Sequence, residues 1–436
     1  MSKPKLIEAF AVTLFIGWFL TSPQALAFEP LKGDMSTFDP TQQVFPTSGD
    51  TIKVGLLDPF TGPGTFSGEM YYLGLGWVVH DINTQGGIMV DGKRKKIQII
   101  KGDTQAKPEV GEQVAERLCR EDKIDVMVGT AGSHINRIAQ GIAAKYQKIY
   151  VNNASPSDFL HDGKNFNRYT FRTCGTNSML ASALAYYYST RPERRFYILC
   201  QDYVFGHDLG EAFKRYLKQY SPQAQIVGEA YHPLFTKDLA PYLSKIPDSK
   251  AEVIFTGDWA ADVENLIKQS RQMGMTLPLA GPFVYHAPAL EAIGGPAGRG
   301  CAVVSFYQPS FDHPQNNTFV EMWHEQSSKW KEPYDSASIE PGMVGLYWLF
   351  DVIQRAGSLD PEKIIQTWEG DEYHSITGAV MKMRACDHQT VMDLYVSRLD
   401  FPTKWQSKSA GYTQSFVVPA RFCLPPVAED LERCKK

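Results

Sequence analysis

Short apolar segments alternate with amphipathic helical patterns through most of this chain, and no other feature constrains the fold as strongly. The segments expected to form strands are IKVGLL (52–57), KIQIIKGD (96–103), IDVMVG (124–129), IYVNN (149–153), FYILC (196–200), QIVGEAY (225–231), AEVIFTG (251–257) and CAVVSF (301–306). Between them, apolar residues recur at spacings of three and four, as at Met70, Leu73, Trp77 and Ile82. This alternation predicts parallel sheets covered by helices on both faces. More than a dozen such elements exceed one ordinary sheet, so we expect an α/β protein with two lobes.

The composition agrees with a globular protein and argues against nucleic acid as a partner. The chain has 436 residues, of which 43% are hydrophobic, so it can bury two cores. Its formal net charge is −4, and neither sign of charge forms a long run. Nucleic-acid binding requires a basic face, which this charge balance does not favour.

The first 27 residues have the pattern of an export signal. Lys3 and Lys5 precede an apolar run at residues 10–20, and the small-residue sequence ALA follows at 25–27. We interpret residues 1–27 as a cleaved signal peptide and expect a periplasmic mature protein that starts near Phe28. A retained N-terminal anchor is the alternative, although the apolar run is short for a membrane span. Later segments lack long apolar runs, so we expect no direct membrane anchor.

Export permits disulfide bonds among the seven cysteines. Cys423 and Cys434 lie in the C-terminal tail, where a bridge would hold the end of the chain in place. We favour Cys386 as the partner of Cys434. An odd number of cysteines leaves at least one thiol unpaired or bonded to another molecule.

The residues that follow the expected strands are rich in glycine, hydroxyl and aromatic side chains. They are DPFTGP, GTAGSH, NNASPSD, QDYVFGHD and GDWAAD, and each leads into an expected helix. In parallel sheets, ligands bind beyond the carboxyl ends of the strands. We therefore expect these segments to line one cleft.

These segments also resemble a known family. IKVGLLDPFTGPGTFSG, DINTQGGI, GDTQAKPEV, VMVGTAGSH, FRTCGTN, DYVFGHDLGEAF and VIFTGDWAADVENLIKQSRQMGM occur in the order typical of periplasmic solute-binding proteins of the leucine-binding type. These proteins serve ABC importers of branched-chain and hydrophobic amino acids. The resemblance covers residues 52 to 420, and MRACDHQTVMDLYV resembles members that take aromatic or other organic acids.

The resemblance implies the type I periplasmic binding fold, in which two Rossmann-like lobes are joined by a hinge of three crossings. The boundaries we expect are 1–27 signal peptide, 28–50 extended arm, 51–172 plus about 302–355 N-terminal lobe, 173–301 plus about 356–420 C-terminal lobe, and 421–436 tail. The family also implies a monomer without a cofactor that carries a small organic ligand to an inner-membrane ABC permease.

The resemblance further implies which residues meet the ligand. Ser133 stands where amino-acid receptors hold the ligand carboxylate, although a helix N-cap would also account for it. His134 follows it and faces either cleft or solvent. Pro156 replaces a hydroxyl residue and has no N–H, so Ser155 or Ser157 is the expected substitute. Phe283 stands where many receptors place an acid that pairs with the ligand ammonium.

Asp258 is the remaining candidate for an ammonium partner, and its alternative role is the N-cap of the helix that follows. Aromatic residues expected to enclose an apolar ligand are Phe66, Phe205, Trp259, Tyr285 and Tyr307. We therefore predict a ligand with an acid at one end, apolar or aromatic bulk, and no free α-amino group. A genuine branched-chain amino acid is the alternative ligand.

Other classes of function have weaker support in the sequence. It contains no G-x-S-x-G, Walker A or H-E-x-x-H motif, so we do not expect an enzyme. Cys386, Asp387 and His388 are adjacent, and adjacent residues rarely converge on one metal ion, so we expect no metal site. A sensing or accessory receptor with the same lobes remains an alternative to transport, because the fold does not separate the two.

Overall fold

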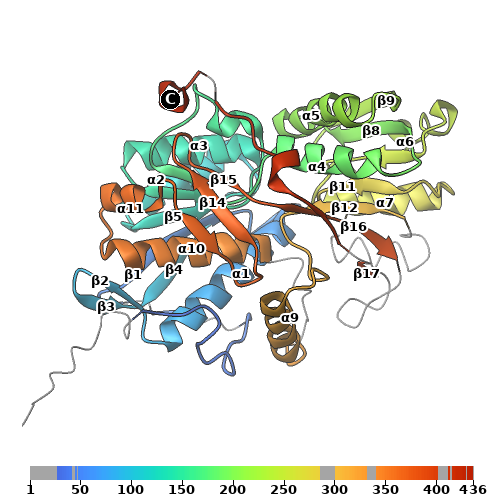
Figure 1. The fold of residues 1–436 in the computed structure, drawn as a ribbon. Coiled ribbons are helices and arrows are strands. Elements are labelled where there is room, and N and C mark those ends of the chain that lie inside the picture. Colours follow the sequence, from blue (N-terminus) through green and yellow to red (C-terminus); the bar gives the residue numbers. More distant parts are fainter. Residues whose placement is uncertain are drawn as a thin grey trace, which may run out of the picture.

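The protein forms two lobes, each built on its own sheet (Figure 1). The computed structural model describes residues 27–41, 45–46, 48–284, 300–330, 340–400, 411–412, 415–428 and 430–435. Expected strands and helices recur at nearly the expected positions, and the α/β class is confirmed. The helices of the described residues are too short or too polar to cross a membrane.

The first lobe contains an eight-stranded sheet with the order β13-β14-β15-β7-β6-β5-β1-β4. Its strands are β1 (Ile52–Asp58), β4 (Ile97–Asp103), β5 (Val126–Gly129), β6 (Ile149–Asn152), β7 (Thr170–Arg172), β13 (Glu372–His374), β14 (Val380–Arg384) and β15 (Gln389–Val391). Six neighbouring strands of this sheet run parallel: β15, β7, β6, β5, β1 and β4. β14 and β13 extend the sheet beyond β15 in antiparallel pairs. A separate hairpin pairs β2 (Ile88–Val90) with β3 (Lys93–Lys95).

Helices cover both faces of this sheet. Successive apolar residues of a strand point to opposite faces, so each face needs helices to bury it. The helices of this lobe are α1 (Thr65–Thr84), α2 (Pro108–Arg120), α3 (Ser133–Lys145), α9 (Pro314–Ser327), α10 (Glu340–Ala356) and α11 (Pro361–Trp368), with the short 3-10 helix η2 (Asp158–His161). Val126 and Val128 of β5 join the core that contains α1 and α10. Met127 between them joins the core under α2 and α3.

The second lobe contains an eight-stranded sheet with the order β17-β16-β12-β11-β10-β8-β9, and β18 pairs with β16. Its strands are β8 (Arg195–Gln201), β9 (Gln225–His232), β10 (Val253–Phe255), β11 (Leu279–Gly281), β12 (Ala302–Ser305), β16 (Leu394–Asp400), β17 (Gly411–Tyr412) and β18 (Phe416–Val418). Its helices are α4 (Asn177–Ser189), α5 (Val204–Tyr220), α6 (Ala240–Leu243) and α7 (Ala261–Gln272), with the 3-10 turn η3 (Pro247–Ser249). Ile198 and Leu199 of β8 again enter different cores.

The expected lobe boundaries in the C-terminal half were wrong in two places. β12 lies in the second sheet, not in the N-terminal lobe, because it hydrogen-bonds to β11 and β16. The hairpins β13 to β15 belong to the first sheet, not to the C-terminal lobe. β15 pairs with β7 there, and Trp368 of α11 stacks on Phe171 with ring centroids 4.4 Å apart.

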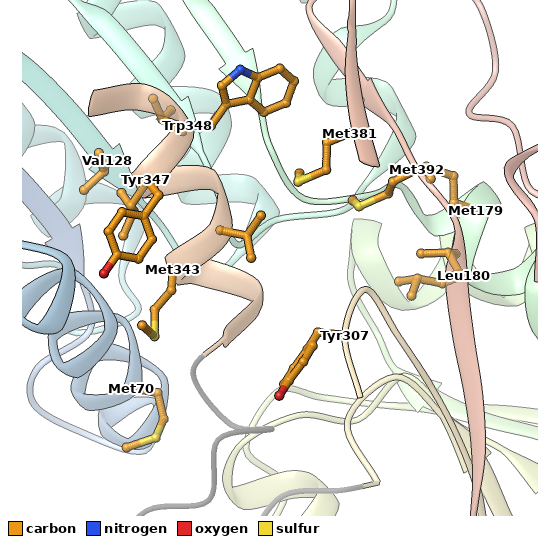
Figure 2. Packing of buried hydrophobic residues seen from close by; sticks show 14 of the residues in the cluster. Met70, Val128, Met179, Leu180, Tyr307, Met343, Tyr347, Trp348, Met381 and Met392 are labelled. Carbon is orange, nitrogen blue, oxygen red and sulfur yellow. The ribbon is translucent and has the colours of Figure 1, made fainter. Parts of the chain in front are cut away.

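Residues 173–176, 306–313 and 392–393 therefore connect the two sheets. Around these crossings one apolar cluster runs from the first lobe into the second. Figure 2 shows Met70 and Met343 on the first-lobe side of this cluster and Met179 and Leu180 of α4 on the other. Buried apolar side chains thus form one continuous cluster across the hinge.

The segment after the expected cleavage site packs on the first lobe. The N–H of Phe28 donates to Gln354 Oε1 at 2.9 Å, and the N–H of Leu31 donates to Asp81 Oδ2 at 2.7 Å. Phe38 makes an edge contact with Trp77, with ring centroids 5.4 Å apart. The part of the expected arm that the structure describes is thus attached to α1 and α10. Residues 1–26 lie outside the described residues.

Candidate functional site

A cavity of about 70 Å³ lies between the two lobes, and residues at the carboxyl ends of strands form most of its walls. The first lobe contributes Phe66, Ser67, Met70, Tyr71, Ala131, Gly132, Ser133, Ala154, Ser155 and Pro156. The second lobe contributes Tyr203, Phe205, Trp259, Ala260 and Phe283. Ligand pockets for drug-sized molecules are typically ~300–1,000 Å³, so this cavity suits a compact ligand.

The first-lobe wall contains the start of α3. Gly132 precedes this helix with φ +90°, a left-handed conformation that glycine adopts without strain. Ile135 and Asn136 donate to the Gly132 carbonyl, so the N–H groups of Ser133 and His134 come before the first intrahelical bond. The Ser133 hydroxyl has no hydrogen-bond partner among the described residues. A helix start with a free hydroxyl is suited to binding an anion.

Buried side chains hold the loop that leads into α3. The Ala131 N–H donates to Asp58 Oδ1 at 2.7 Å, and the Tyr150 hydroxyl donates to the Gly129 carbonyl at 2.8 Å. Ser155 donates its hydroxyl proton to the Thr130 carbonyl at 2.6 Å. Ser155 thus lines the cavity with its proton already engaged, and it can only accept a hydrogen bond from a ligand.

The carboxyl group of Asp58, below the loop that leads into α3, has a raised pKa. It is fully buried at the end of β1, and this burial raises the pKa of Asp58 to about 8. At pH 7 the group is therefore mostly protonated. A neutral Asp58 supports the loop without repelling an anion at the start of α3.

The second-lobe wall is aromatic. The indole N–H of Trp259 donates to the Tyr203 hydroxyl at 2.9 Å, which fixes the two rings relative to each other. Burial raises the pKa of Tyr203, so its hydroxyl stays neutral. Phe205 and Phe283 lie with ring centroids 5.9 Å apart. These rings offer flat apolar surface to one side of any bound molecule.

The structure brings six of the residues selected from the sequence to this one cavity. They are Phe66, Ser133, Ser155, Phe205, Trp259 and Phe283. Ser133 is the first residue of α3, so its expected alternative role as N-cap falls to Gly132. His134 is outside the lining, and its ring makes an edge contact with Tyr203 at 5.6 Å. Burial lowers the pKa of His134 and keeps the imidazole neutral.

Asp258 has neither of the positions expected for it. It does not line the cavity, and α7 starts at Ala261 with Ala260 as its N-cap. Instead, Asp258 Oδ2 lies 2.9 Å from His232 Nε2, with both side chains fully buried. Burial disfavours the charged imidazole, but the hydrogen bond and charge of Asp258 outweigh it and raise the pKa of His232 to about 9. This pair joins the end of β9 to the segment after β10, next to Trp259 of the cavity wall.

The two remaining aromatic candidates are not in the lining. Tyr307 is buried in the apolar cluster between the lobes (Figure 2). Its ring packs on Phe319 with centroids 6.2 Å apart. Its position after β12 brings it to the hinge because β12 ends next to a crossing. Tyr285 lies outside the described residues.

Tyr203 and Tyr71 were not among the lining residues selected from the sequence. Tyr203 lies within QDYVFGHD, and Tyr71 lies three residues after IKVGLLDPFTGPGTFSG. Tyr203 lies two residues after the end of β8, in the kind of position used to select the other candidates. Tyr71 and Met70 are on the first turns of α1, where apolar spacing indicates core packing. The second turn of a helix that starts at a cleft can therefore line it as well.

The described residues contain one cluster of potential metal ligands, formed by Cys386, Asp387 and Cys434. Cys386 and Cys434 are bonded to each other in a disulfide, so neither offers a thiolate. Both oxygens of Asp387 accept hydrogen bonds from Arg384. The donor set is therefore engaged within the protein.

Comparison with known proteins decides the family. The profile described as periplasmic binding protein matches residues 51–408. This chain belongs to the periplasmic binding protein family. The family consists of solute-binding receptors, and membership implies a periplasmic location.

Curated relatives of this periplasmic binding protein are distant in sequence and match it over most of its length. It is 22% identical to the leucine-, isoleucine-, valine-, threonine- and alanine-binding protein of Pseudomonas aeruginosa over 335 residues, which cover 76% of this chain and 85% of that one. It is 24% identical to the leucine-specific-binding protein of Salmonella typhimurium, with 62% and 71% of the two chains covered.

Solved structures confirm the fold of this periplasmic binding protein. A solute-binding protein of an ABC transporter from Rhodopseudomonas palustris in complex with benzoate has a TM-score of 0.73 at 20% identity, covering 88% of this chain and 100% of that one. The closed conformation of the leucine-, isoleucine-, valine-, threonine- and alanine-binding protein from Brucella ovis has a TM-score of 0.75 at 20% identity, covering 88% of this chain and 98% of that one. At this identity the likeness concerns the fold.

Proposed function

We propose that this periplasmic binding protein captures a compact apolar or aromatic carboxylate between its lobes and delivers it to an inner-membrane ABC permease. One observation carries the proposal. The described lining of the cavity has no acidic or basic side chain, while the start of α3 offers N–H groups and the Ser133 hydroxyl. Such a lining favours a ligand whose only charge is an anionic end at α3.

The absence of an acid among these lining residues argues against an α-amino acid. Burying an ammonium group without a counter-charge costs several kcal/mol, which corresponds to at least about a hundredfold in affinity. Phe283 occupies the cavity wall, and the carboxylate of Asp258 is engaged by His232. An amine at this end of the ligand would therefore lack a partner.

The ligands of similar proteins support both the proposal and its alternative. Similar structures from Rhodopseudomonas palustris hold benzoate and 3,4-dihydroxybenzoic acid. The curated relatives are named for leucine and related amino acids. The aromatic wall of Tyr203, Phe205, Trp259 and Phe283 favours the first group, because flat rings stack on flat ligands.

The proposed mechanism is closure of the lobes around the ligand. Each lobe contributes one wall, so a ligand contacts both walls only when the lobes are closed. Binding then shifts the population toward the closed state by the free energy of the second-lobe contacts. The permease would recognise that closed state. A sensing partner would recognise the same closed state, so only an uptake measurement separates transport from sensing.

Isothermal titration calorimetry with matched pairs of ligands tests the proposed chemistry. 4-Methylpentanoate and leucine differ by the α-ammonium group alone, as do 3-phenylpropanoate and phenylalanine. We expect the two acids and benzoate to bind at least about a hundredfold more tightly than the amino acids. Equal or tighter binding of leucine would show that this chain is a branched-chain amino acid receptor.

Two further measurements test the biological part of the proposal. Mass spectrometry of the protein from a periplasmic extract should give a mature N-terminus near Phe28 if residues 1–27 form a signal peptide. Ligand recovered after incubation should be chemically unchanged, as expected for a receptor rather than an enzyme. Uptake of the radiolabelled acid should stop when the gene is deleted, whereas a purely sensory role would leave uptake intact.

A further inference from the structure

The chain does not end in the second lobe after its last strand. From β18 it continues through two 3-10 turns, η6 (Ala420–Phe422) and η7 (Glu432–Cys434), and returns to the first lobe. We propose that residues 419–428 and 430–435, here called the C-terminal strap, form a fourth connection between the lobes. The strap holds the lobes in the orientation that encloses the cavity.

The strap is anchored first on the second lobe. Ser182 of α4 and Tyr220 of α5 donate their hydroxyl protons to the Phe422 carbonyl at 2.6 and 2.8 Å. The ring of Phe422 stacks on Tyr186, with centroids 4.3 Å apart. Cys423 follows and is buried. Residues 420–423 are thus packed on α4 and α5 by polar and apolar contacts together.

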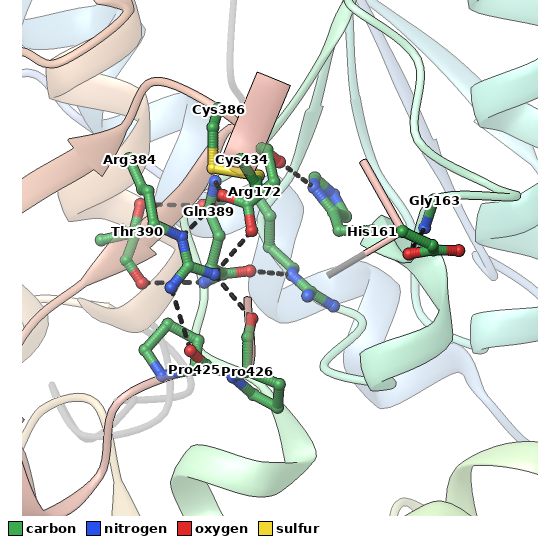
Figure 3. Close-up of polar contacts among 12 residues, drawn as sticks. His161, Gly163, Arg172, Arg384, Cys386, Gln389, Thr390, Pro425, Pro426 and Cys434 are labelled. Carbon is green, nitrogen blue, oxygen red and sulfur yellow. Dashed lines mark hydrogen bonds and ion pairs between the residues drawn. A yellow bond between two sulfur atoms is a disulfide. The ribbon is translucent and has the colours of Figure 1, made fainter. Parts of the chain in front are cut away.

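A second set of anchors fixes the strap to the first lobe. The guanidinium of Arg384 on β14 donates to the carbonyls of Pro425 and Pro426 at 3.0 and 2.7 Å (Figure 3). Asp430 Oδ1 accepts the N–H of Gly163 at 3.0 Å. The disulfide between Cys434 and Cys386, in the turn between β14 and β15, joins the end of the strap covalently to this lobe.

The distance between the two sets of anchors is short along the chain. Only Cys423 and Leu424 separate the carbonyl held by α4 and α5 from the carbonyl held by Arg384. Three peptide steps span at most about 10 Å. A large rotation of one lobe against the other must therefore stretch this link or detach one anchor. The Cys386–Cys434 disulfide keeps the end of the strap on the first lobe. Hydrogen bonds between Arg384 and the strap can therefore form again rapidly after they break.

The strap also crosses the hinge on residues that do not touch the cavity. Arg384, Asp387 and Asp430 line a separate cavity of about 550 Å³ next to the strap, whereas the ligand cavity shares no residue with it. Changes to the strap therefore act on the lobe orientation without replacing any residue that lines the cavity between the lobes.

Small-angle X-ray scattering of the ligand-free protein tests the strap. Inserting Gly-Ser-Gly-Ser between Leu424 and Pro425 lengthens the link at an exposed residue and retains the disulfide. We expect the distance distribution to shift to longer distances, as it should for Cys434→Ser or after reduction. The matched control is the same insertion after Gly92, in the exposed turn between β2 and β3.

The outcomes separate a strap from an ordinary stabilising bridge. If Cys434→Ser lowers the melting temperature while the Leu424 insertion leaves scattering unchanged, the strap does not control the lobes and the inference is wrong. Circular dichroism verifies that each variant is folded. Because the scattering is measured without ligand, failure of benzoate to bind would contradict the proposed function and leave this test unaffected.

Discussion

The two walls of the ligand cavity are built from different chemistry. The first-lobe wall combines the start of α3 and the hydroxyls of Ser133 and Ser155 with the side chains of Phe66, Met70 and Tyr71. Its polar part is the loop into α3, which Asp58 supports by accepting the Ala131 N–H. The second-lobe wall presents the rings of Tyr203 and Trp259 with two phenylalanines. This difference suggests that the first lobe binds the charged end of a ligand and the second lobe encloses its body. The lobes would then contribute separately to recognition of charge and of shape.

The largest expected effect concerns the charged end. Ser133→Asp places a carboxylate at the start of α3, and repulsion should weaken benzoate binding by about 1,000-fold, measured by calorimetry. An acid in the first turn of a helix is favourable for folding, so thermal stability should be kept. Ser133→Ala is the matched control and should cost about tenfold through the lost hydroxyl. If both variants bind benzoate normally, the charged end lies elsewhere.

The next effect concerns the aromatic wall. Trp259→Ala should weaken benzoate binding by about 30- to 100-fold, because a large aromatic contact surface is lost. Trp323→Ala serves as the control, since Trp323 is fully buried against Trp77 and is not among the lining residues. It should lower the free energy of unfolding by about 3–5 kcal/mol with little change in the affinity of the folded protein. A Trp259 variant that loses stability but not affinity would assign Trp259 to the core.

A third prediction uses the buried carboxyl group under the first wall. The ordinary pKa of 3.8 for Asp58 rises to about 8 in the fold, so the native state holds a proton that the unfolded chain releases. The free energy of unfolding should therefore fall as pH rises from about 4 to about 8. Asp58→Asn removes this group and should flatten that part of the stability curve, measured by urea unfolding at several pH values. An unchanged slope would mean that Asp58 is ionised in the native state.

The smallest effect concerns the contact inside the second wall. Tyr203→Phe removes the acceptor of the Trp259 indole N–H and keeps the ring. We expect about a fivefold loss of affinity, corresponding to roughly 1 kcal/mol for one hydrogen bond. Phe205→Tyr provides a control that adds a hydroxyl to the same wall. A loss as large as that of Trp259→Ala would show that the hydroxyl itself binds the ligand.

Much of the fold could be predicted because local patterns determine it. β1 was expected at 52–57 and is found at Ile52–Asp58, since a continuous apolar run is buried on both faces of a parallel sheet. The division between lobes could not be predicted for β12 and for β13 to β15. β12 pairs with β16, where Ser305 lies opposite Tyr395, 90 residues away, and β15 pairs with β7, where Gln389 lies opposite Arg172, 217 residues away. No local pattern encodes that choice.

In the candidate site too, local sequence position predicted some residues correctly and long-range pairing overturned others. Ser133 and Trp259 follow strands, so their position in sequence brings them to the cleft. Asp258 also follows a strand, but its carboxylate is engaged by His232, which lies 26 residues earlier at the end of β9. A pairing of side chains across two strands depends on which way each side chain points. Strand-end position alone therefore overestimates the number of residues that line the cavity.

The attachment of both chain ends to one lobe has a practical consequence for making an optical reporter from this protein. Phe28 is held by Gln354 of α10, and Cys434 is bonded to Cys386 beside β15, so both described ends belong to the first lobe. Fluorescent proteins fused to the two termini would move together and give little change in energy transfer. One fluorophore would have to be inserted in a surface loop of the second lobe, such as the exposed Lys237–Asp238 turn, for its distance to the other to follow ligand capture.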